Sequence, residues 1–203
     1  FEKSFVFWRL RVKALEEAIR RQGEGIGTEI VKVDRFLNHR LDTALLVAMG
    51  REIAAVFLSD QPSLILTVEA SGIALALTTA LALGNIPVVF AKKHASSTLN
   101  GEMYSATIRS FTKGNSYDMR CAAHCIDKKD RVLIVDDFLA NGEAALGMLS
   151  LIRQAGALCV GIAVAIEKAF QKGGRALRAQ GIKTLSLAAI REIRDGEILF
   201  QEG

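Results

Sequence analysis

One stretch of the chain, Val132 to Ala145 (VLIVDDFLANGEAA), joins four consecutive apolar residues to two carboxylates, a short loop and a helical sequence. An uninterrupted aliphatic run bounded by charge is typical of a strand buried on both faces, and such strands occur in parallel sheets covered by helices. The stretch therefore predicts an α/β fold with a mostly parallel central sheet flanked by helices. Ligands bind such sheets at the carboxyl ends of the strands, where Asp136 and Asp137 are expected.

The two carboxylates and the loop that follows them predict a phosphorylated ribose as the ligand. Adjacent Asp136 and Asp137 repel each other unless a cation or hydroxyl donors lie between them. In the loop, Gly142 permits an unusual backbone angle, and the next helix presents free N–H groups to an anion. Ribose hydroxyls would satisfy the carboxylates, and a 5-phosphate would satisfy the loop. The alternative is a surface Asp-Asp turn without a ligand, which the apolar run and the Asn-Gly helix entry disfavour.

Two further predicted strands, 64–68 and 87–91, end in residues suited to an anion. The first continues through a glycine-containing turn into a helix, so the turn offers backbone N–H groups and a hydroxyl. The second is followed directly by two ammonium groups. Because the carboxyl ends of parallel strands share one edge of a sheet, these groups are expected near the carboxylates. They belong to Glu69, Ser71, Gly72, Lys92 and Lys93.

The composition restricts what the chain can be. Its 203 residues, half of them hydrophobic, can bury one sizeable core, so we expect a single domain. The net charge of +4 is scattered rather than gathered in a basic stripe, and therefore does not require nucleic acid as a partner. Residues 71–91 carry no charged side chain, but Gly84 to Pro87 divides them into a helix and a strand, so no membrane span is predicted. Neither G-x-G-x-x-G nor G-x-x-x-x-G-K-[ST] follows a predicted strand, which disfavours NAD-dependent and ATP-hydrolysing enzymes.

The three cysteines predict a reducing compartment, and we expect the cytoplasm, because an odd number in a chain of this size does not indicate a disulfide framework. Cys121, His124 and Cys125 suggest zinc as an alternative. A structural zinc site needs four ligands, however, and Cys159 belongs to a predicted core strand. A reduced pair near a strand end is the simpler interpretation.

Six motifs in one order resemble the type I phosphoribosyltransferase family, whose members transfer a phosphoribosyl group from phosphoribosyl pyrophosphate (PRPP) to a base. They extend over nearly the whole chain from about Val12 and are KVDRFLNH, TVEASGIA, VVFAKKH, YSATIRSFTK, DDFLANG and AIEKAFQ. Within the family, the resemblance is to members that act on xanthine. It implies purine salvage, in which xanthine and PRPP give xanthosine 5′-monophosphate (XMP) and pyrophosphate. It also implies a homodimer, a small base-binding hood and an antiparallel flap beside the sheet.

The resemblance assigns the PRPP-binding residues by their place in the motifs. The catalytic carboxylates Asp136 and Asp137 would hold the ribose, and the turn after the strand 64–68, together with the two lysines, would hold the pyrophosphate. Mg²⁺ is expected to bind through PRPP, and no residue is predicted as a direct metal ligand. The 5-phosphate would bind the loop formed by Ala140, Asn141, Gly142, Glu143 and Ala144.

The same resemblance places the purine against Val31, Asn38 and Lys168. An amide at Asn38 can donate to one edge atom of a purine and accept from another, although a lone Asn is more often a cap or turn residue. A cation at Lys168 near the oxo groups would favour xanthine, which readily becomes an anion near neutral pH. Guanine, hypoxanthine or adenine stays open as the base, because few hydrogen bonds decide the choice.

Two residues depart from the wider superfamily. Ala140 stands where many relatives that use hypoxanthine or guanine carry an acid, so no general base is assigned. Glu143 places a carboxylate inside the phosphate loop, and we expect it to point away while its backbone N–H binds. The alternative function is a regulator that keeps the PRPP-binding fold but binds nucleic acid instead of catalysing transfer. The lack of a separate helix-turn-helix segment and of a basic stripe disfavours it.

The remaining segments complete the predicted organisation. Residues 29–37 are expected to be extended in the hood, and 105–111 and 117–122 to pair as the flap. Residues 95–104 are expected to form a mobile loop that closes over PRPP and excludes water. Residues 1–11 fall outside the resemblance and are expected to be an N-terminal extension, with natural translation starting at Val12. Residues 12–203 then form the single phosphoribosyltransferase domain.

Overall fold

The computed structural model describes residues 13–93, 101–109 and 116–201. Several expectations concern other parts of the chain and lie outside the described residues. They are the N-terminal extension with its start at Val12, most of the loop 95–104, and the turn that joins the two strands of the flap.

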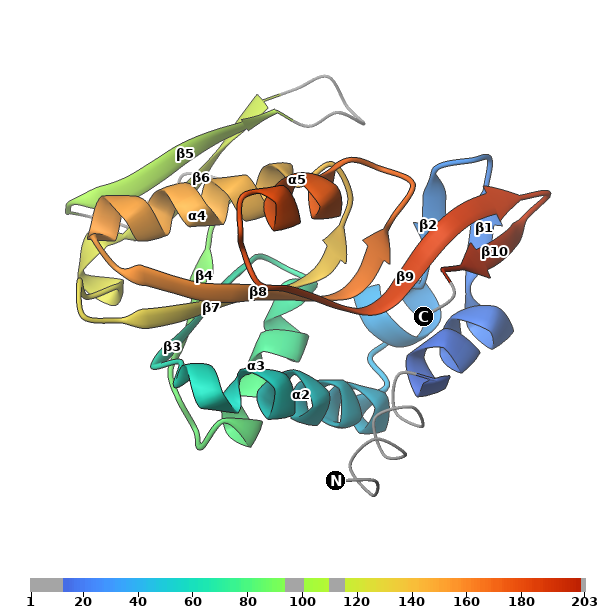
Figure 1. Cartoon of the computed structure of the whole chain (residues 1–203), viewed down its shortest axis with the longest axis horizontal. Coiled ribbons are helices and arrows are strands. Elements are labelled where there is room, and N and C mark those ends of the chain that lie inside the picture. Colours follow the sequence, from blue (N-terminus) through green and yellow to red (C-terminus); the bar gives the residue numbers. More distant parts are fainter. Residues whose placement is uncertain (1–12, 94–100, 110–115, 202–203) are drawn as a thin grey trace.

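A six-stranded sheet forms the centre of the fold, with the strand order β10-β9-β8-β7-β3-β4 (Figure 1). Only β10 runs antiparallel to its neighbour within this sheet, and the other four pairings are parallel. The prediction of a mostly parallel sheet is therefore confirmed. The strands are β3 (Leu64–Val68), β4 (Val88–Ala91), β7 (Arg131–Leu139), β8 (Leu158–Lys168), β9 (Thr184–Arg194) and β10 (Glu197–Phe200).

Helices cover both faces of this sheet (Figure 1). Their ends follow local signals in the sequence: the side chain of Asp42 accepts a hydrogen bond from the N–H of Leu45 at the start of one helix, and Gly156 ends another in a left-handed conformation. One face carries α4 (Glu143–Ala155) and α5 (Gly173–Ala179), and the other carries α2 (Thr43–Phe57) and α3 (Gly72–Ala82).

The apolar run of β7 is continuous because this strand serves two cores. Val132 and Ile134 pack into the cluster beneath α4, whereas Leu133 and Val135 pack into the cluster beneath α2 and α3. All four side chains are fully buried. Side chains of a strand alternate between the two faces of a sheet, so a strand covered on both sides needs apolar residues at every position.

The segment before the sheet folds differently from the prediction. A helix over residues 13–22 leads into β1 (Glu24–Ile26), β2 (Ile30–Lys32) and a π-helix at Asp34–Asn38. The extended conformation predicted for residues 29–37 is correct at β2 and wrong after it. Phe36 and Leu37 are both buried, and a helical turn can bury two consecutive side chains where a strand covered on one side would expose one. We call residues 24–38 the hood.

The hood is attached to the end of the sheet formed by β9 and β10 (Figure 1). The strand β1, which contains Gly25 at its centre, was not among the elements predicted from the sequence. Gly25 lies so close to the β9–β10 turn that an added Cβ would be 2.6 Å from Cγ2 of Ile193 and 2.9 Å from the carbonyl oxygen of Gly196. This close approach fixes the hood on the hairpin.

The flap is an antiparallel pair, β5 (Met103–Arg109) and β6 (Ser116–Ala122), which projects beside α4 (Figure 1). It is connected to the sheet by two backbone hydrogen bonds between Lys92 and Arg120, of 2.8 and 2.9 Å. The predicted flap is confirmed, although β5 begins two residues earlier than expected. Two short 3-10 helices, Leu58–Asp60 and Ala123–Cys125, complete the described elements, and none of the helices described is long and apolar enough to cross a membrane.

Candidate active site

Asp136 and Asp137 lie inside β7, which continues to pair with β8 as far as Leu139 opposite Glu167. Their exposed fractions are 6% and 9%, and the N–H of Asp137 donates to Oδ1 of Asp136 over 2.9 Å. Burial, followed by the neighbouring charge of Asp137, raises the pKa of Asp136 well above its usual value, and Lys93 opposes this only in part. Asp136 is therefore costly to ionise without a bound cation or hydroxyl donors.

The turn after β3 lies directly beside these carboxylates. A Cβ added to Gly72 would be 2.7 Å from Oδ1 of Asp136, so only glycine allows this approach. The carboxylate of Glu69 accepts a hydrogen bond of 2.7 Å from the N–H of Lys93, and the Glu69–Ala70 peptide bond is cis. Ser71 precedes α3 as its N-cap, with no hydrogen bond from its side chain to the helix. The structure thus brings the predicted turn, Lys93 and the carboxylates together.

The two predicted lysines diverge. The charge of Lys93 acts on Asp136, and its Nζ is 5.9 Å from the ring centre of Tyr117. Lys92 instead lines a separate cavity of about 220 Å³ between β4 and β6, together with Phe90 and Arg120. Of the pair, Lys93 is the one that the fold places beside the carboxylates.

The loop 140–144, which we call the phosphate loop, follows β7 and opens α4. Gly142 has φ of 89°, a left-handed conformation that glycine adopts without strain, and α4 begins at the next residue. All five residues of this loop line a cavity of about 940 Å³. Behind the loop, the N–H of Gly173 donates to the carbonyl oxygen of Ala140 over 3.1 Å. The five predicted loop residues thus lie together in the lining of one large cavity, whereas the carboxylate pair and the turn after β3 do not line it.

The same cavity is also lined by Lys168, Phe138 and Phe170. Lys168 Nζ donates to the backbone oxygen of Glu29 in the hood over 2.6 Å and lies 5.8 Å from the ring centre of Phe138. Burial lowers the pKa of Lys168, and the charge of Glu29 opposes this change. A half-buried ammonium group beside an aromatic ring is suited to a planar ligand that carries oxygen atoms or negative charge.

The two other predicted base contacts belong to the hood but do not line this cavity. Val31 is packed in the core with 8% of its surface exposed, and Asn38 ends the π-helix with an exposed side chain. The hood residues that line the cavity are Glu29 and Ile30. The structure therefore brings the hood to the base end of the cavity through the residues that precede Val31.

Several cavity residues were missed in the sequence. Tyr117, from the flap, lines the cavity together with Glu143, and its pKa is raised first by burial and then by the charges of Asp136 and Glu143. Arg175 and Lys172 line the cavity from the start of α5. No local pattern marks Tyr117, because the approach of the flap is a tertiary contact. The run Lys-Gly-Gly-Arg at 172–175 was the available signal for these residues, since glycines in the first turn of a helix allow close packing against a neighbour.

The described residues contain no group of three His, Cys, Asp or Glu side chains that could hold a metal ion. This holds for the cysteine cluster as well: all three cysteines of the chain are unpaired, and burial raises the pKa of Cys121 to about 12, which keeps its thiol protonated. The structure thus offers no support for the zinc alternative.

A carboxylate pair at the carboxyl edge of a parallel sheet, with a loop that opens a helix and a glycine-containing turn close by, is the arrangement typical of enzymes that hold a phosphorylated sugar at this edge. The family model described as "Phosphoribosyl transferase domain" matches residues 41–175. The chain belongs to the phosphoribosyltransferase family, in the group of xanthine phosphoribosyltransferases.

The similarity to curated relatives covers almost the whole of both chains. The xanthine phosphoribosyltransferase of Moorella thermoacetica is 50% identical over 189 residues, which is 93% of this chain and 96% of the relative. That of Geobacillus thermodenitrificans is 48% identical over 191 residues, with shares of 94% and 98%. Among solved structures, adenine phosphoribosyltransferase from Rhodothermus marinus has a TM-score of 0.72 at 22% identity, over 90% of this chain and 99% of that one, and shares the fold.

Proposed function

We propose that the protein transfers the phosphoribosyl group of PRPP to xanthine, which gives XMP and pyrophosphate in purine salvage. The observation that carries the proposal is the cavity of about 940 Å³ whose lining contains both the phosphate loop and Lys168. The names of the relatives at about half identity agree with it. A regulator without transferase activity is less favoured, because the cavity also provides a site for the accepting base.

The PRPP end is assigned to the residues around the carboxylate pair. Asp136 and Asp137 accept hydrogen bonds from the ribose hydroxyls, and the N–H groups of the phosphate loop bind the 5-phosphate at the start of α4. The pyrophosphate lies against the turn after β3. The close contacts of that turn with Asp136 and Lys93 support this placement. The residues assigned to the pyrophosphate are Glu69, Ser71, Gly72, Lys93 and Lys92, of which Lys92 would have to turn from its present cavity.

The base end is assigned to Lys168 with Val31 and Asn38. Lys168 has one N–H engaged by the carbonyl of Glu29, which leaves two donors for the oxo groups of a purine. Phe138 and Phe170 provide apolar walls for the ring. For Val31 and Asn38, the support is the approach of the hood, whose Glu29 and Ile30 line the same cavity.

The mechanism follows from this arrangement. A ring nitrogen of the base forms a bond to the anomeric carbon of the ribose while the bond from that carbon to pyrophosphate breaks, and the bonding electrons leave with the pyrophosphate. The enzyme holds three groups in line, and this positioning contributes much of the acceleration. The ammonium of Lys93 favours the charge that develops on the leaving group, and Lys168 favours the ionised form of xanthine.

We propose that Mg²⁺ enters with PRPP rather than as a resident ion. The residues fit such a shared cation, because the charge of Lys93 offsets only part of the cost of ionising the buried Asp136. In addition, the described residues contain no group of three side chains that could hold a metal ion by themselves. When bound, Mg²⁺ neutralises part of the charge on the pyrophosphate. The two aspartates then orient the ribose through its hydroxyls.

We further propose a homodimer in the cytoplasm. Leu77, Leu81 and Phe90 have exposed fractions of 53%, 56% and 43% on α3 and β4, within the uncharged segment 71–91, and a second copy would cover them. Sedimentation of the protein with Leu81→Glu tests this assembly.

The unpaired cysteines support a reducing compartment. We also retain residues 12–203 as a single domain, supported by the one sheet on which both hydrophobic clusters pack.

The experiment that tests the reaction measures nucleoside monophosphate formation from PRPP and Mg²⁺ with xanthine, guanine, hypoxanthine and adenine in parallel. Asp137→Asn is expected to abolish turnover. Asp60→Asn is the matched control, since this aspartate precedes β3 at the opposite end of the strand and pairs with Lys183. Xanthine-selective turnover that is lost only in Asp137→Asn supports the proposal. PRPP binding without turnover of any base would instead support the regulator.

A further inference from the structure

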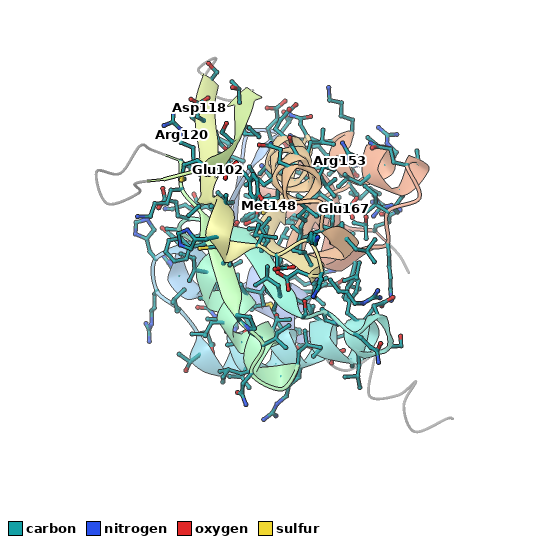
Figure 2. The ribbon with its side chains drawn as sticks, turned by 90° about the vertical axis from the view of Figure 1, so that its left-hand side faces the viewer. Glu102, Asp118, Arg120, Met148, Arg153 and Glu167 are labelled. Carbon is teal, nitrogen blue, oxygen red and sulfur yellow. The ribbon has the colours of Figure 1, made fainter. Side chains whose placement is uncertain are left out.

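Glu167, the residue before the proposed base contact Lys168, has no part in the mechanism derived above. It lies in the interior of the molecule, with 3% of its surface exposed (Figure 2). Its carboxylate accepts hydrogen bonds of 2.5 and 3.1 Å from the two terminal nitrogens of Arg178 in α5, and one of 2.5 Å from Oγ of Ser186 in β9. A buried carboxylate with three donors holds its partners firmly, because losing any of them leaves charge unsatisfied.

The helix that Glu167 holds is packed against the back of the phosphate loop. A Cβ added to Gly173 would be 2.4 Å from the oxygen of Ala140 and 2.6 Å from the nitrogen of Gly142, so the first turn of α5 touches the loop backbone. Gly174, the next residue, packs against the carboxylate of Glu167 itself. The first turn of α5 is therefore confined between Glu167 on one side and the phosphate loop on the other.

The strand geometry separates the action of Glu167 from that of Lys168. Consecutive side chains of a strand point to opposite faces of the sheet, so Glu167 faces α5 whereas Lys168 faces the hood. Glu167 is also paired in register with Leu139, the last residue before the phosphate loop. Its contacts thus lead to the phosphate end of the cavity and not to the base end.

We propose that Glu167 is a positioning residue for PRPP: its ion pair with Arg178 holds the first turn of α5 against the phosphate loop, and thereby sets the direction of the loop N–H groups that bind the 5-phosphate. This inference rests on the proposed function, because it takes the loop to be the site of that phosphate. It adds a requirement that lies outside the assigned binding residues. Loss of the pair loosens the loop without removing any group that touches the substrates.

The test compares variants that break the connection to α5 with one that does not. Glu167→Gln and Arg178→Gln remove the charged pair, whereas Ser186→Ala removes a donor to the same carboxylate from β9 and leaves α5 connected. We expect the KM for PRPP to rise on the order of tenfold to a hundredfold in the first two, since small displacements of a binding group have effects of this size. The KM for xanthine should stay close to that of the parent protein. Ser186→Ala should lower the melting temperature and leave both KM values unchanged.

Arg178→Gln keeps the inference testable if Glu167→Gln fails to fold, because the Arg178 side chain is 44% exposed and its replacement leaves the core intact. Arg178→Lys, which retains a cation, should recover part of the PRPP affinity. Equal KM values for PRPP in all variants, despite lower melting temperatures, would make Glu167 a purely structural residue and overturn the inference.

The parent protein separates this inference from the proposed function. If it shows no turnover with any base, the proposed reaction fails, and PRPP binding measured by calorimetry in Arg178→Gln and Ser186→Ala still decides the role of Glu167. A parent protein that does not bind PRPP overturns both.

Discussion

Replacing Lys168 by methionine should weaken catalysis with xanthine more than with hypoxanthine. The substitution removes an ammonium group that is half-buried beside Phe138 and keeps an apolar side chain of similar length. A hydrogen bond to a charged group contributes about 1.5 to 3 kcal/mol, which corresponds to a loss of about 10-fold to 150-fold in kcat/KM for xanthine. The loss with hypoxanthine should be smaller, because xanthine is the base that is readily ionised near neutral pH.

The folded state should tolerate this substitution. Burial lowers the pKa of Lys168, which means that the charged form is less favourable in the folded protein than in the unfolded chain. Removing the charge removes this cost, while the hydrogen bond to Glu29 is lost. We therefore expect a melting temperature close to that of the parent protein, so that a kinetic change cannot be attributed to unfolding.

The assay is steady-state kinetics with each base at saturating PRPP, and Lys183→Met is the matched control. Lys183 also donates to a carbonyl, that of Val56, and its Nζ lies 4.5 Å from the ring centre of Phe57. It precedes the first residue of β9, whereas Lys168 is the last residue of the parallel strand β8, so the two lysines lie at opposite edges of the sheet. Its replacement should leave kcat/KM unchanged for both bases. Equal losses with xanthine and hypoxanthine in Lys168→Met would refute the role of the cation in base choice.

Three further predictions concern the PRPP end. PRPP affinity should increase as the pH rises through the raised pKa of Asp136, because ribose hydroxyls and a cation favour its ionised carboxylate. Binding measured at a series of pH values should show this increase, and Asp136→Asn should abolish it. The same shift makes the folded state bind this proton more tightly than the unfolded chain, so its contribution to stability falls over the same pH rise. Tyr117→Phe should weaken PRPP binding roughly twofold to tenfold, because it removes a hydroxyl donor from the cavity near the carboxylates. Tyr104→Phe in the neighbouring strand should leave the affinity unchanged. An unchanged affinity in Tyr117→Phe would count against this contact. Glu143→Gln should leave folding intact and increase the affinity for PRPP by less than about tenfold, because it removes a negative charge beside the phosphate. Weaker PRPP binding in calorimetry would contradict the loop assignment.

Elements whose sequence is decided by burial were predictable from the sequence. β3 has the predicted bounds, because five apolar or small residues buried on both faces are followed at once by a turn. The end of α4 at Gly156 depends on a local signal of the same kind, since the left-handed conformation at that residue is a local property of the chain. The phosphate loop was found by the same kind of local signal, a glycine between a strand and a helix.

Features that depend on contacts between distant segments were not predictable. The π-helix at Asp34–Asn38 buries both Phe36 and Leu37 in the core. The local pattern of apolar and polar residues indicated a strand and did not predict that two consecutive side chains would be buried. Tyr117 reaches the cavity only because the flap is fixed to β4 through Lys92 and Arg120. The different directions of Lys92 and Lys93 likewise follow from the bridge to β6 and not from the lysine pair itself.

The attachment of the hood to the β9–β10 hairpin makes the enzyme modular. Gly25 and Gly196 fix the two parts to each other, while the phosphate loop and the carboxylate pair belong to the other strands of the sheet. The hood and this hairpin can therefore be exchanged together in a chimera, because the surfaces that contact each other are then transferred in the same piece. Recombination of this unit would exchange the hood residues next to the proposed base contact, whereas Lys168 on β8 and the residues assigned to the sugar would stay with the rest of the chain.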